Sequence, residues 1–401
     1  MTLKVYFDNG ATTPLKPEVL EAMTPYFCEV YGNPSSLHSA GAAAARAVQS
    51  ARETVSKCIN AEPAEIIFTG SGTEADNIAI NGVLSALEKI QIARGVNGKG
   101  HIIISAIEHH GVLYIAKKLK AQGYEVSYIG VDKTGKVNPQ EVVNAVKDNT
   151  LIISIMHANN EVGTIQPIAE IAEKLSKVNS GRAQRVYFHS DCVQSAGKIA
   201  LDVKALGVDL VSIASHKFYG PKGVGVLYVK KGVPVAPILF GGAQERGLRP
   251  GTENVAGIVG FAKAFEIAVE NLDKNAEYVS KLCASLCNGI LSTVPETVVN
   301  GSLEKSVSGI VNIGFKCIEG EAILLKLSQA GVAVSTGSAC ATDSVEPSHV
   351  LSAMGVDTLA AAGAVRFSLG CQNTKEEVDY VLSILPKIVE DLRKMSPLWK
   401  S

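Results

Sequence analysis

The side chain best placed for covalent chemistry is Lys217, which ends an apolar segment. The apolar segment is 209–214, Lys217 follows it after Ser215 and His216, and a turn rich in glycine and proline occupies 218–223. The apolar segments 209–214 and 223–229 predict two buried strands, so Lys217 lies in the connection between them. Functional side chains concentrate in such connections, and this amine could form a Schiff base with a carbonyl compound. The alternative for a lysine in a loop is a solvated surface side chain.

A second candidate is the turn Gly-Ser-Gly-Thr-Glu-Ala at 70–75, between a predicted strand at 65–69 and a predicted helix at 73–87. Backbone N–H groups at the start of a helix attract an anion, so a phosphate suits this position. Glycine turns also serve as plain chain reversals. No Gly-Lys-Ser/Thr follows, which disfavours a nucleotide triphosphatase of the P-loop type. Ser215 and His216, beside Lys217, could complete the phosphate site.

Two further candidates end predicted strands. Asp191 follows the segment 186–189, at the edge where open α/β sheets bind ligands. Its carboxylate could face a cation, and in an enzyme that uses pyridoxal phosphate (PLP) that cation is the pyridine nitrogen. A helix cap is the alternative for Asp191. His109 ends another strand and could stack on the same ring; a structural histidine is the alternative there.

The elements that must position these residues alternate between strand and helix, which predicts an α/β fold with a mostly parallel sheet between helices. Strands are expected at 101–105, 125–131, 151–156 and 186–189, and helices at 36–60, 73–87, 111–121 and 168–178. After Asn254 one or two helices leave the sheet. A smaller α/β unit follows, with strands at 308–315 and 364–369 and helices at 320–330 and 374–394. We expect a large domain over 14–258 and a small domain made of 1–13 and 259–401.

Size and composition agree with two domains in a water-soluble enzyme. A single core usually stops growing at roughly 250–300 residues, and the chain has 401. The formal net charge of −1 gives no electrostatic case for binding nucleic acid or an anionic membrane. No apolar run is long enough to span a bilayer, and the first residues lack a signal-peptide pattern, so we expect a cytoplasmic protein. The eight cysteines show no spacing typical of a metal site.

Taken together, these motifs resemble the NifS/IscS-type cysteine desulfurases, which are fold-type I PLP enzymes of the class V aminotransferase group. The resemblance covers essentially the whole chain. It is carried by ordered motifs at 7–14, 32–38, 68–77, 157–163, 215–223, 249–252 and 335–340. It implies a large PLP-binding domain with a mostly parallel seven-stranded sheet between helices, plus a smaller α/β domain with the catalytic cysteine loop.

The resemblance assigns the residues around the PLP ring. Lys217 holds PLP as a Schiff base and later moves protons on the substrate carbons. Asp191 pairs with the pyridine nitrogen, and His109 stacks on the ring. Gln194 and Asn160 lie toward the phenolic oxygen of the PLP ring.

The same resemblance assigns the two ends of the site. Phosphate binding is implied for Gly72, Thr73, His216 and, from the other subunit of a homodimer, Thr252. Asn33 and Arg366 grip the substrate carboxylate, since a planar guanidinium matches a carboxylate in a bidentate way. No metal is implied.

Cys340 is the implied nucleophile. Its thiolate attacks the sulfur of the L-cysteine substrate, which leaves a persulfide on the enzyme and releases L-alanine. An unperturbed thiol has a pKa of ~8.5, so a helper is needed at neutral pH, and His109 is the natural one. Small and polar residues at 335–344 favour a mobile loop that carries the persulfide to an iron–sulfur scaffold or another sulfur-acceptor protein.

Other functions remain open from the sequence. A selenocysteine lyase, an aminotransferase or a cysteine sulfinate lyase of the same group needs PLP and Lys217 but not Cys340. A sulfur-delivery scaffold without turnover is a third possibility, and the intact set of Lys217, Asp191, His109, Arg366 and Cys340 argues against it.

Four departures from the family pattern stand out. Ala214 replaces a usual serine, which puts one phosphate hydrogen bond in doubt. Asp343 adds a negative charge that modestly opposes thiolate formation. Cys371 replaces a usual arginine, and a few extra residues at 179–185 predict an enlarged surface loop.

Overall fold

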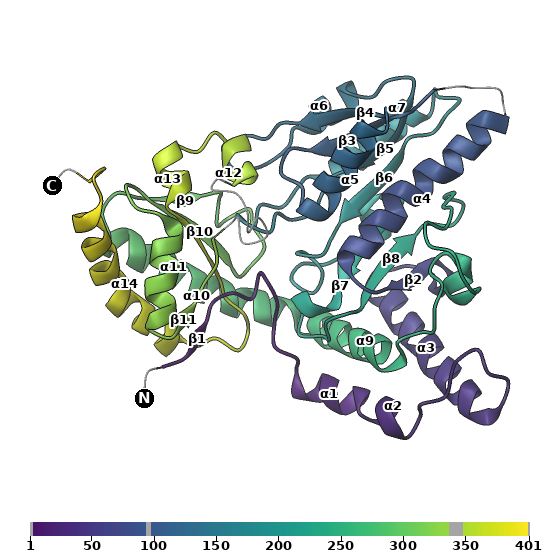
Figure 1. The fold of residues 1–401 in the computed structure, drawn as a ribbon, viewed down its shortest axis with the longest axis horizontal. Coiled ribbons are helices and arrows are strands. Elements are labelled where there is room, and N and C mark those ends of the chain that lie inside the picture. Colours follow the sequence, from purple (N-terminus) through teal and green to yellow (C-terminus); the bar gives the residue numbers. More distant parts are fainter. Residues whose placement is uncertain (1–2, 94–97, 337–347, 400–401) are drawn as a thin grey trace.

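The computed structural model describes residues 3–93, 98–336 and 348–399 of the chain. Its elements gather in two lobes, with the larger built around a central sheet (Figure 1). The large sheet has seven strands in the order β2-β8-β7-β6-β5-β3-β4. These are β2 (Ile66–Thr69), β3 (His101–Ser105), β4 (Glu125–Ile129), β5 (Thr150–Ser154), β6 (Tyr187–Asp191), β7 (Leu210–Ala214) and β8 (Gly225–Val229). Only β8 runs against its neighbours, so the predicted mostly parallel seven-stranded sheet is confirmed.

Helices cover both faces of this sheet. One face carries α1 (Pro17–Met23), α2 (Pro25–Cys28), α3 (Ser39–Cys58), α6 (Pro139–Asn144), α7 (Ile168–Asn179), α8 (Val203–Leu206) and α9 (Val255–Glu270). The other face carries α4 (Gly72–Ala93) and α5 (His110–Ala121). Successive side chains of a strand point to opposite faces. Accordingly Ile66 and Phe68 join the core with α3 and α9, whereas Ile67 joins the core with α4 and α5.

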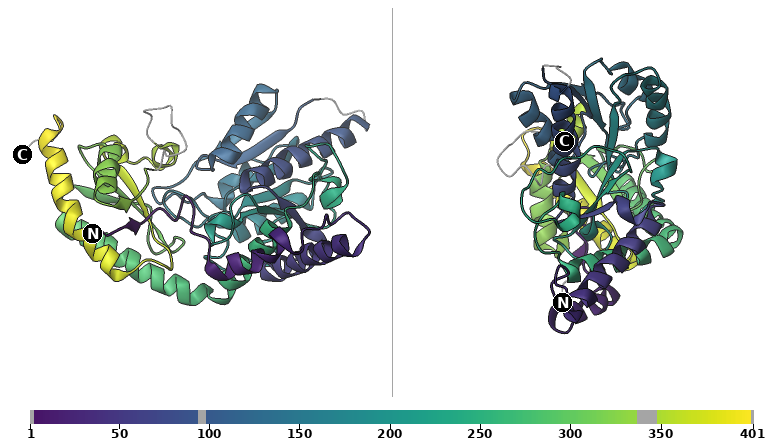
Figure 2. Two further views of the ribbon diagram at one scale, coloured as in Figure 1. Left: turned by 60° about the horizontal axis from the view of Figure 1, so that its bottom comes forward. Right: turned by 90° about the vertical axis from the view of Figure 1, so that its right-hand side faces the viewer.

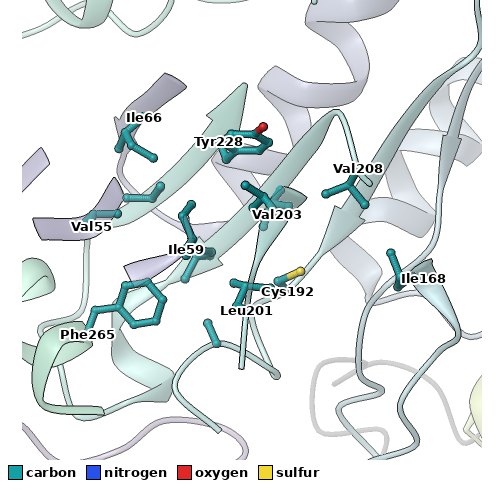
Figure 3. Close-up of a cluster of buried hydrophobic side chains, with 14 of the residues drawn as sticks. Val55, Ile59, Ile66, Ile168, Cys192, Leu201, Val203, Val208, Tyr228 and Phe265 are labelled. Carbon is teal, nitrogen blue, oxygen red and sulfur yellow. The ribbon is translucent and has the colours of Figure 1, made fainter. Parts of the chain in front are cut away.

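The first of these cores has many members that are closed to solvent. Figure 3 shows Ile59 directly after α3, Ile66 from β2 and Phe265 from α9 in this cluster, and each has 0% of its surface exposed. Three aromatic rings, those of Phe218, Phe261 and Phe265, pack here with centroids 5.0–6.0 Å apart. Because Phe218 follows Lys217 directly, this core anchors the segment that carries the lysine.

The smaller lobe has its own sheet and core. Strand β10 (Ile310–Phe315) pairs antiparallel with both β9 (Thr297–Asn300) and β12 (Ala364–Ser368). The helices of this lobe are α10 (Leu272–Thr293), α11 (Gly320–Gln329), α12 (His349–Ala353), α13 (Thr358–Ala362) and α14 (Lys375–Met395). Figure 2 shows α10 and α14 running side by side along this lobe, where they pack on each other.

The N-terminal segment connects the lobes. β1 (Val5–Tyr6) pairs in parallel with β11 (Val332–Ala333) in the smaller lobe, and the chain then crosses to α1 under the larger one (Figure 1). Val5 and Phe7 are buried in the core of the smaller lobe. On the way the chain pairs with the end of β12, since the backbone N–H of Asn9 donates to the carbonyl of Ser368 at 3.0 Å. Residues 8–13 therefore lie between the two lobes.

Most predicted elements are present within one to three residues of their expected ends. An exception is α4, which is expected to stop at 87 but extends to Ala93. Strand β6 extends two residues beyond His189 to Asp191, so this carboxylate ends the strand itself. Within the described residues, no helix is long and apolar enough to cross a membrane.

Candidate active site

A cavity of about 300 Å³ lies at the edge of the large sheet, where the carboxyl ends of the parallel strands meet. Nine of the residues singled out from the sequence line it: Gly72, Thr73, His109, Asn160, Asp191, Gln194, His216, Lys217 and Arg366. These residues come from both lobes and span nearly 300 positions of sequence, so the fold brings distant motifs into one site.

Lys217 lies in a short 3-10 turn, Ser215–Lys217, directly after β7. Its Nζ donates to the carbonyl oxygens of Gly10 at 2.7 Å and Ala11 at 2.8 Å. The N-terminal segment therefore fixes the amine at the cavity wall. The predicted strand-to-strand connection is confirmed, because β8 follows the turn.

Asp191 ends β6 and is 5% exposed. Its Oδ1 accepts a hydrogen bond from the N–H of Val193 at 2.9 Å. Burial raises the pKa of Asp191 to about 6, although the Val193 N–H and the charge of Lys217 act in the opposite direction. This carboxylate therefore gains from any cationic partner that enters the cavity.

Asp76 received no role from the sequence. It is on α4 and lines the same cavity as Asp191. It is 1% exposed, and its Oδ1 has no hydrogen-bond partner among the described residues. Burial, and then the nearby Asp191, hold the pKa of Asp76 well above its usual range. A protonated Asp76 beside an ionised Asp191 is the expected state of two carboxyls in one site.

His109 caps the start of α5. Its Nδ1 accepts the N–H of Gly111 at 3.1 Å, so Nε2 carries the proton of the neutral ring. Burial, and then Lys217, lower the pKa of His109 to about 4. The ring is therefore neutral at physiological pH, and its Nε2–H is a hydrogen-bond donor.

The start of α4 forms one end of the cavity. Gly72 approaches Val193 so closely that a Cβ at this position would lie 2.6 Å from Val193 Cγ2. The cavity lining here includes Ser71 and Thr73. His216 faces this end from the lysine turn, and burial lowers its pKa to about 4. A helix start lined by hydroxyls suits a phosphate.

Arg366 reaches the cavity from β12 in the smaller lobe. Its Nη1 donates to the carbonyl of Asn160 at 2.9 Å, and its Nη2 to Asp8 Oδ1 at 3.0 Å. The side chain is 6% exposed, and its Nε is buried without a hydrogen-bond partner among the described residues. A guanidinium held on one edge can bind a carboxylate on the other.

Three of the predicted residues that the structure describes, Asn33, Ser215 and Thr252, are not among those lining this cavity. Asn33 and Thr252 are exposed, and Asn33 Oδ1 accepts the N–H of Ser35 at 2.9 Å. Ser215 is buried, with its Oγ toward Gly220, where an added Cβ would lie 1.8 Å away. Cys340 and Asp343 lie outside the described residues.

The cavity fits a phosphorylated carbonyl compound such as PLP. Lys217 supplies the amine, Asp191 an anion for a ring nitrogen, and α4 a helix start for a phosphate. Gly72 leaves the space that a larger residue would fill. Among the described residues, no group of three His, Cys, Asp or Glu side chains could hold a metal ion.

Comparisons with known proteins show what the whole chain is similar to. A family model described as aminotransferase class-V matches residues 5–381. A cysteine desulfurase IscS from Clostridium botulinum strain Hall is 48% identical over 403 residues, covering 100% of this chain and 98% of the relative. A cysteine desulfurase IscS from Methanosarcina thermophila is 49% identical over 394 residues, covering 98% and 94%.

Two solved structures share the fold over nearly their whole length. A structure described as a NifS-like protein has a TM-score of 0.89 and 42% sequence identity, covering 97% of this chain and 100% of that chain. A structure described as SspA in complex with cysteine has a TM-score of 0.79 and 34% identity, covering 93% and 100%.

Proposed function

The chain belongs to the class-V aminotransferase family and, within it, to the cysteine desulfurases, and from this membership we propose that it takes sulfur from L-cysteine and releases L-alanine. The observation that supports this most strongly is the shared cavity, where Lys217 Nζ, the Asp191 carboxylate and the Arg366 guanidinium meet. These are an amine for a carbonyl, an anion for a ring cation and a cation for a carboxylate.

We propose PLP as the cofactor. Lys217 would hold its carbonyl carbon, Asp191 its ring nitrogen, and Gly72, Thr73 and His216 its phosphate. Gln194 and Asn160 would lie toward the phenolic oxygen, and His109 against the ring. Bound there, PLP supplies an electron sink that allows bonds at the substrate carbons to break. Ser215 was predicted to bind the phosphate. Its hydroxyl lies toward Gly220, so this role requires the hydroxyl to rotate toward the cavity.

Three side chains of the cavity would have separate roles in the reaction. Arg366 binds the substrate carboxylate with the edge that Asn160 and Asp8 leave available, and Asn33 assists. Lys217 moves protons at the substrate carbons once its amine is released. His109 is neutral, with its proton on Nε2, so in this state Nε2 donates a hydrogen bond and does not accept one.

The sulfur transfer balances without an external oxidant. The bond between the substrate's β carbon and its sulfur breaks, and a bond forms between that sulfur and Sγ of Cys340. The electron pair of the broken bond stays on carbon, which takes up the proton that the thiol gives up. The products are L-alanine and a persulfide on Cys340. A sulfur-acceptor protein, an iron–sulfur scaffold or a protein that thiolates cofactors, then takes the outer sulfur atom.

The test measures alanine release from L-cysteine, with and without dithiothreitol as acceptor. We expect the wild type to release alanine, and Lys217→Ala to lose both turnover and the visible absorption of lysine-bound PLP. Cys340→Ser should keep that absorption and lose persulfide and alanine. Undiminished alanine release by Cys340→Ser would favour a selenocysteine lyase or another relative that needs no thiol.

A homodimer in the cytoplasm is part of the proposal. Thr252 is exposed and would reach the phosphate of the other subunit. Large apolar side chains are exposed on the segments at 27–37 and 239–240, among them Tyr31 at 76% and Phe240 at 88%. Exposed apolar surface of this kind marks protein–protein contacts, which supports a dimer.

The two-domain division also stays a proposal. Val5 and Phe7 pack in the smaller lobe, as the assignment of 1–13 to the small domain requires. Phe261 and Phe265 pack in the core of the larger lobe, which favours a boundary near Asn271 over one at 258.

A further inference from the structure

Lys198 is a half-buried lysine that the proposed reaction does not use. It follows Gln194 by four residues, and its Nζ donates to Gln194 Oε1 at 2.9 Å. Lys198 and Lys217 both line a second cavity, of about 50 Å³, which adjoins the active site. A lysine in such a position is either a plain turn-stabilising residue or part of the site.

A chain of hydrogen bonds connects the two lysines. Gln194 Nε2 donates to the carbonyl oxygen of Gly10 at 2.9 Å, and Lys217 Nζ donates to the same oxygen at 2.7 Å. The path thus runs from Lys198 through the amide of Gln194 and the carbonyl of Gly10 to Lys217.

We propose that Lys198 is a positioning residue, which fixes the amide of Gln194 and adds a second positive charge that favours the neutral, nucleophilic amine of Lys217. This inference rests on the proposed Schiff-base role of Lys217 and goes beyond the sulfur transfer itself.

The amide of Gln194 is oriented from both ends. Lysine only donates, so Oε1 must face Lys198, and the carbonyl of Gly10 only accepts, so Nε2 must face Gly10. One N–H of Nε2 is used by Gly10, and the second is left to donate to an oxygen in the active-site cavity, which Gln194 also lines. Without Lys198 this orientation would depend on a single hydrogen bond.

The charges around Lys198 are positive. Burial, and then Lys217 and Arg366, lower the pKa of Lys198 to about 7. Lys16, Tyr219 and Cys371 also line the second cavity, and no carboxylate does so among the described residues. Lys198 in turn contributes to the lowered pKa of His216. Because the interaction of two like charges is mutual, a charged Lys198 disfavours the protonated form of Lys217.

The test measures the pH dependence of Lys217 acetylation in the full chain without PLP, by competitive labelling with trace acetic anhydride and peptide mass spectrometry. In Lys198→Arg the neighbouring charge persists at all pH values. In Lys198→Met it is absent. We expect the Lys217 midpoint to lie roughly 1 pH unit lower in Lys198→Arg than in Lys198→Met. Wild type should fall between them, because Lys198 loses its own proton near pH 7.

The matched control is Lys204→Met, which removes an exposed lysine whose Nζ donates to Asn60 Oδ1. This variant should keep the wild-type midpoint. Equal midpoints in Lys198→Arg and Lys198→Met would overturn the proposal. If Lys198→Met does not fold, Lys198→Gln replaces it as the neutral variant, and the same comparison decides.

A second readout uses PLP. The pH midpoint of the visible band of the PLP-loaded chain should shift in the same order as the acetylation midpoint. Acetylation needs neither PLP nor turnover, so a chain that releases no alanine refutes the proposed function and leaves this comparison valid.

Discussion

At the scale of single residues, Arg366 is held by fixed partners on one edge of its guanidinium. The carbonyl of Asn160 and the carboxylate of Asp8 use Nη1 and Nη2. Arg366→Lys keeps the positive charge but loses the planar, multiply donating group. We expect the KM for L-cysteine to rise about 10-fold or more, as for the loss of a charged hydrogen bond, with the visible band of bound PLP unchanged. Steady-state kinetics and absorption spectra measure the two quantities.

A matched control is Arg393→Lys on α14. Its guanidinium donates to the backbone carbonyls of Pro295, Glu296 and Lys316. That variant should leave KM unchanged. A KM that rises equally in both variants would mean that stability, and not substrate binding, is affected.

The sequence alone predicted the location of those residues that directly follow a buried strand. Lys217 and Asp191 follow apolar runs, so their place at a sheet edge can be derived without a partner. Asp76 and Lys198 were not assigned. Each lies on a helix or turn with many polar neighbours, and only the folded chain places them against Asp191 and Gln194. Arg366 was assigned by resemblance alone, because its strand belongs to the other lobe.

At the scale of elements, the start of α4 packs closely against the turn after β6. Gly72→Ala places a Cβ 2.6 Å from Val193 Cγ2, which is far inside contact distance. Overpacking of this kind costs about 1–3 kcal/mol, so we expect PLP to bind about 10–100-fold more weakly. Titration of the PLP-free chain measures the dissociation constant.

The rescue experiment is the double variant Gly72→Ala with Val193→Ala, which removes the clashing methyl group and should restore most of the affinity. Gly130→Ala is the control, since a Cβ there meets nothing within 4 Å. Failure of the double variant to recover would mean that Gly72 is needed for its backbone and not for the space it leaves.

The packing of α9 on the sheet depends on the rings beside the lysine turn. Phe265 is 0% exposed and lies 5.0 Å from Phe218, centroid to centroid. Phe265→Ala should lower the free energy of unfolding by about 3–5 kcal/mol. Urea unfolding measures this value. Val269→Ala, on the same helix but 40% exposed, should stay within about 0.5 kcal/mol of wild type.

The long elements could be predicted because their apolar periodicity is strong, as in α3, α7 and α14. The short ones could not. Strand β9 was missed, because it has four residues, only one of them buried. It is a strand only because β10 pairs with it, which is a tertiary effect that no local pattern contains.

At the scale of the whole molecule, burial of ionisable groups makes stability depend on pH. Glu108 is 0% exposed, and burial raises its pKa to about 8, against an ordinary value near 4.5. The folded chain therefore holds a proton on Glu108 that the unfolded chain releases, so this contribution to stability is present at low pH and is lost as pH rises through 8.

We expect wild type to lose about 1–2 kcal/mol relative to Glu108→Gln between pH 6.5 and 8, because glutamine mimics the protonated acid. Urea unfolding at several pH values measures the difference. Glu321→Gln, at an exposed position of α11, is the control and should follow wild type. Parallel pH profiles for Glu108→Gln and wild type would contradict a protonated Glu108.

The crossing of residues 8–13 between the lobes sets the order in which the site is completed during synthesis. Asp8 binds Arg366, and Gly10 donates its N–H to Ser368 Oγ at 2.8 Å, in each case to a residue 358 positions later. A ribosome-bound chain that has exposed only the large sheet can hold Lys217 beside Asp191. It still lacks β12, the strand to which residues 8–10 bind. With the substrate-binding role proposed for Arg366, this end of the site would form last, after β12 has left the ribosome. With the roles proposed for these residues, the cofactor-binding half would come together before the half that binds cysteine.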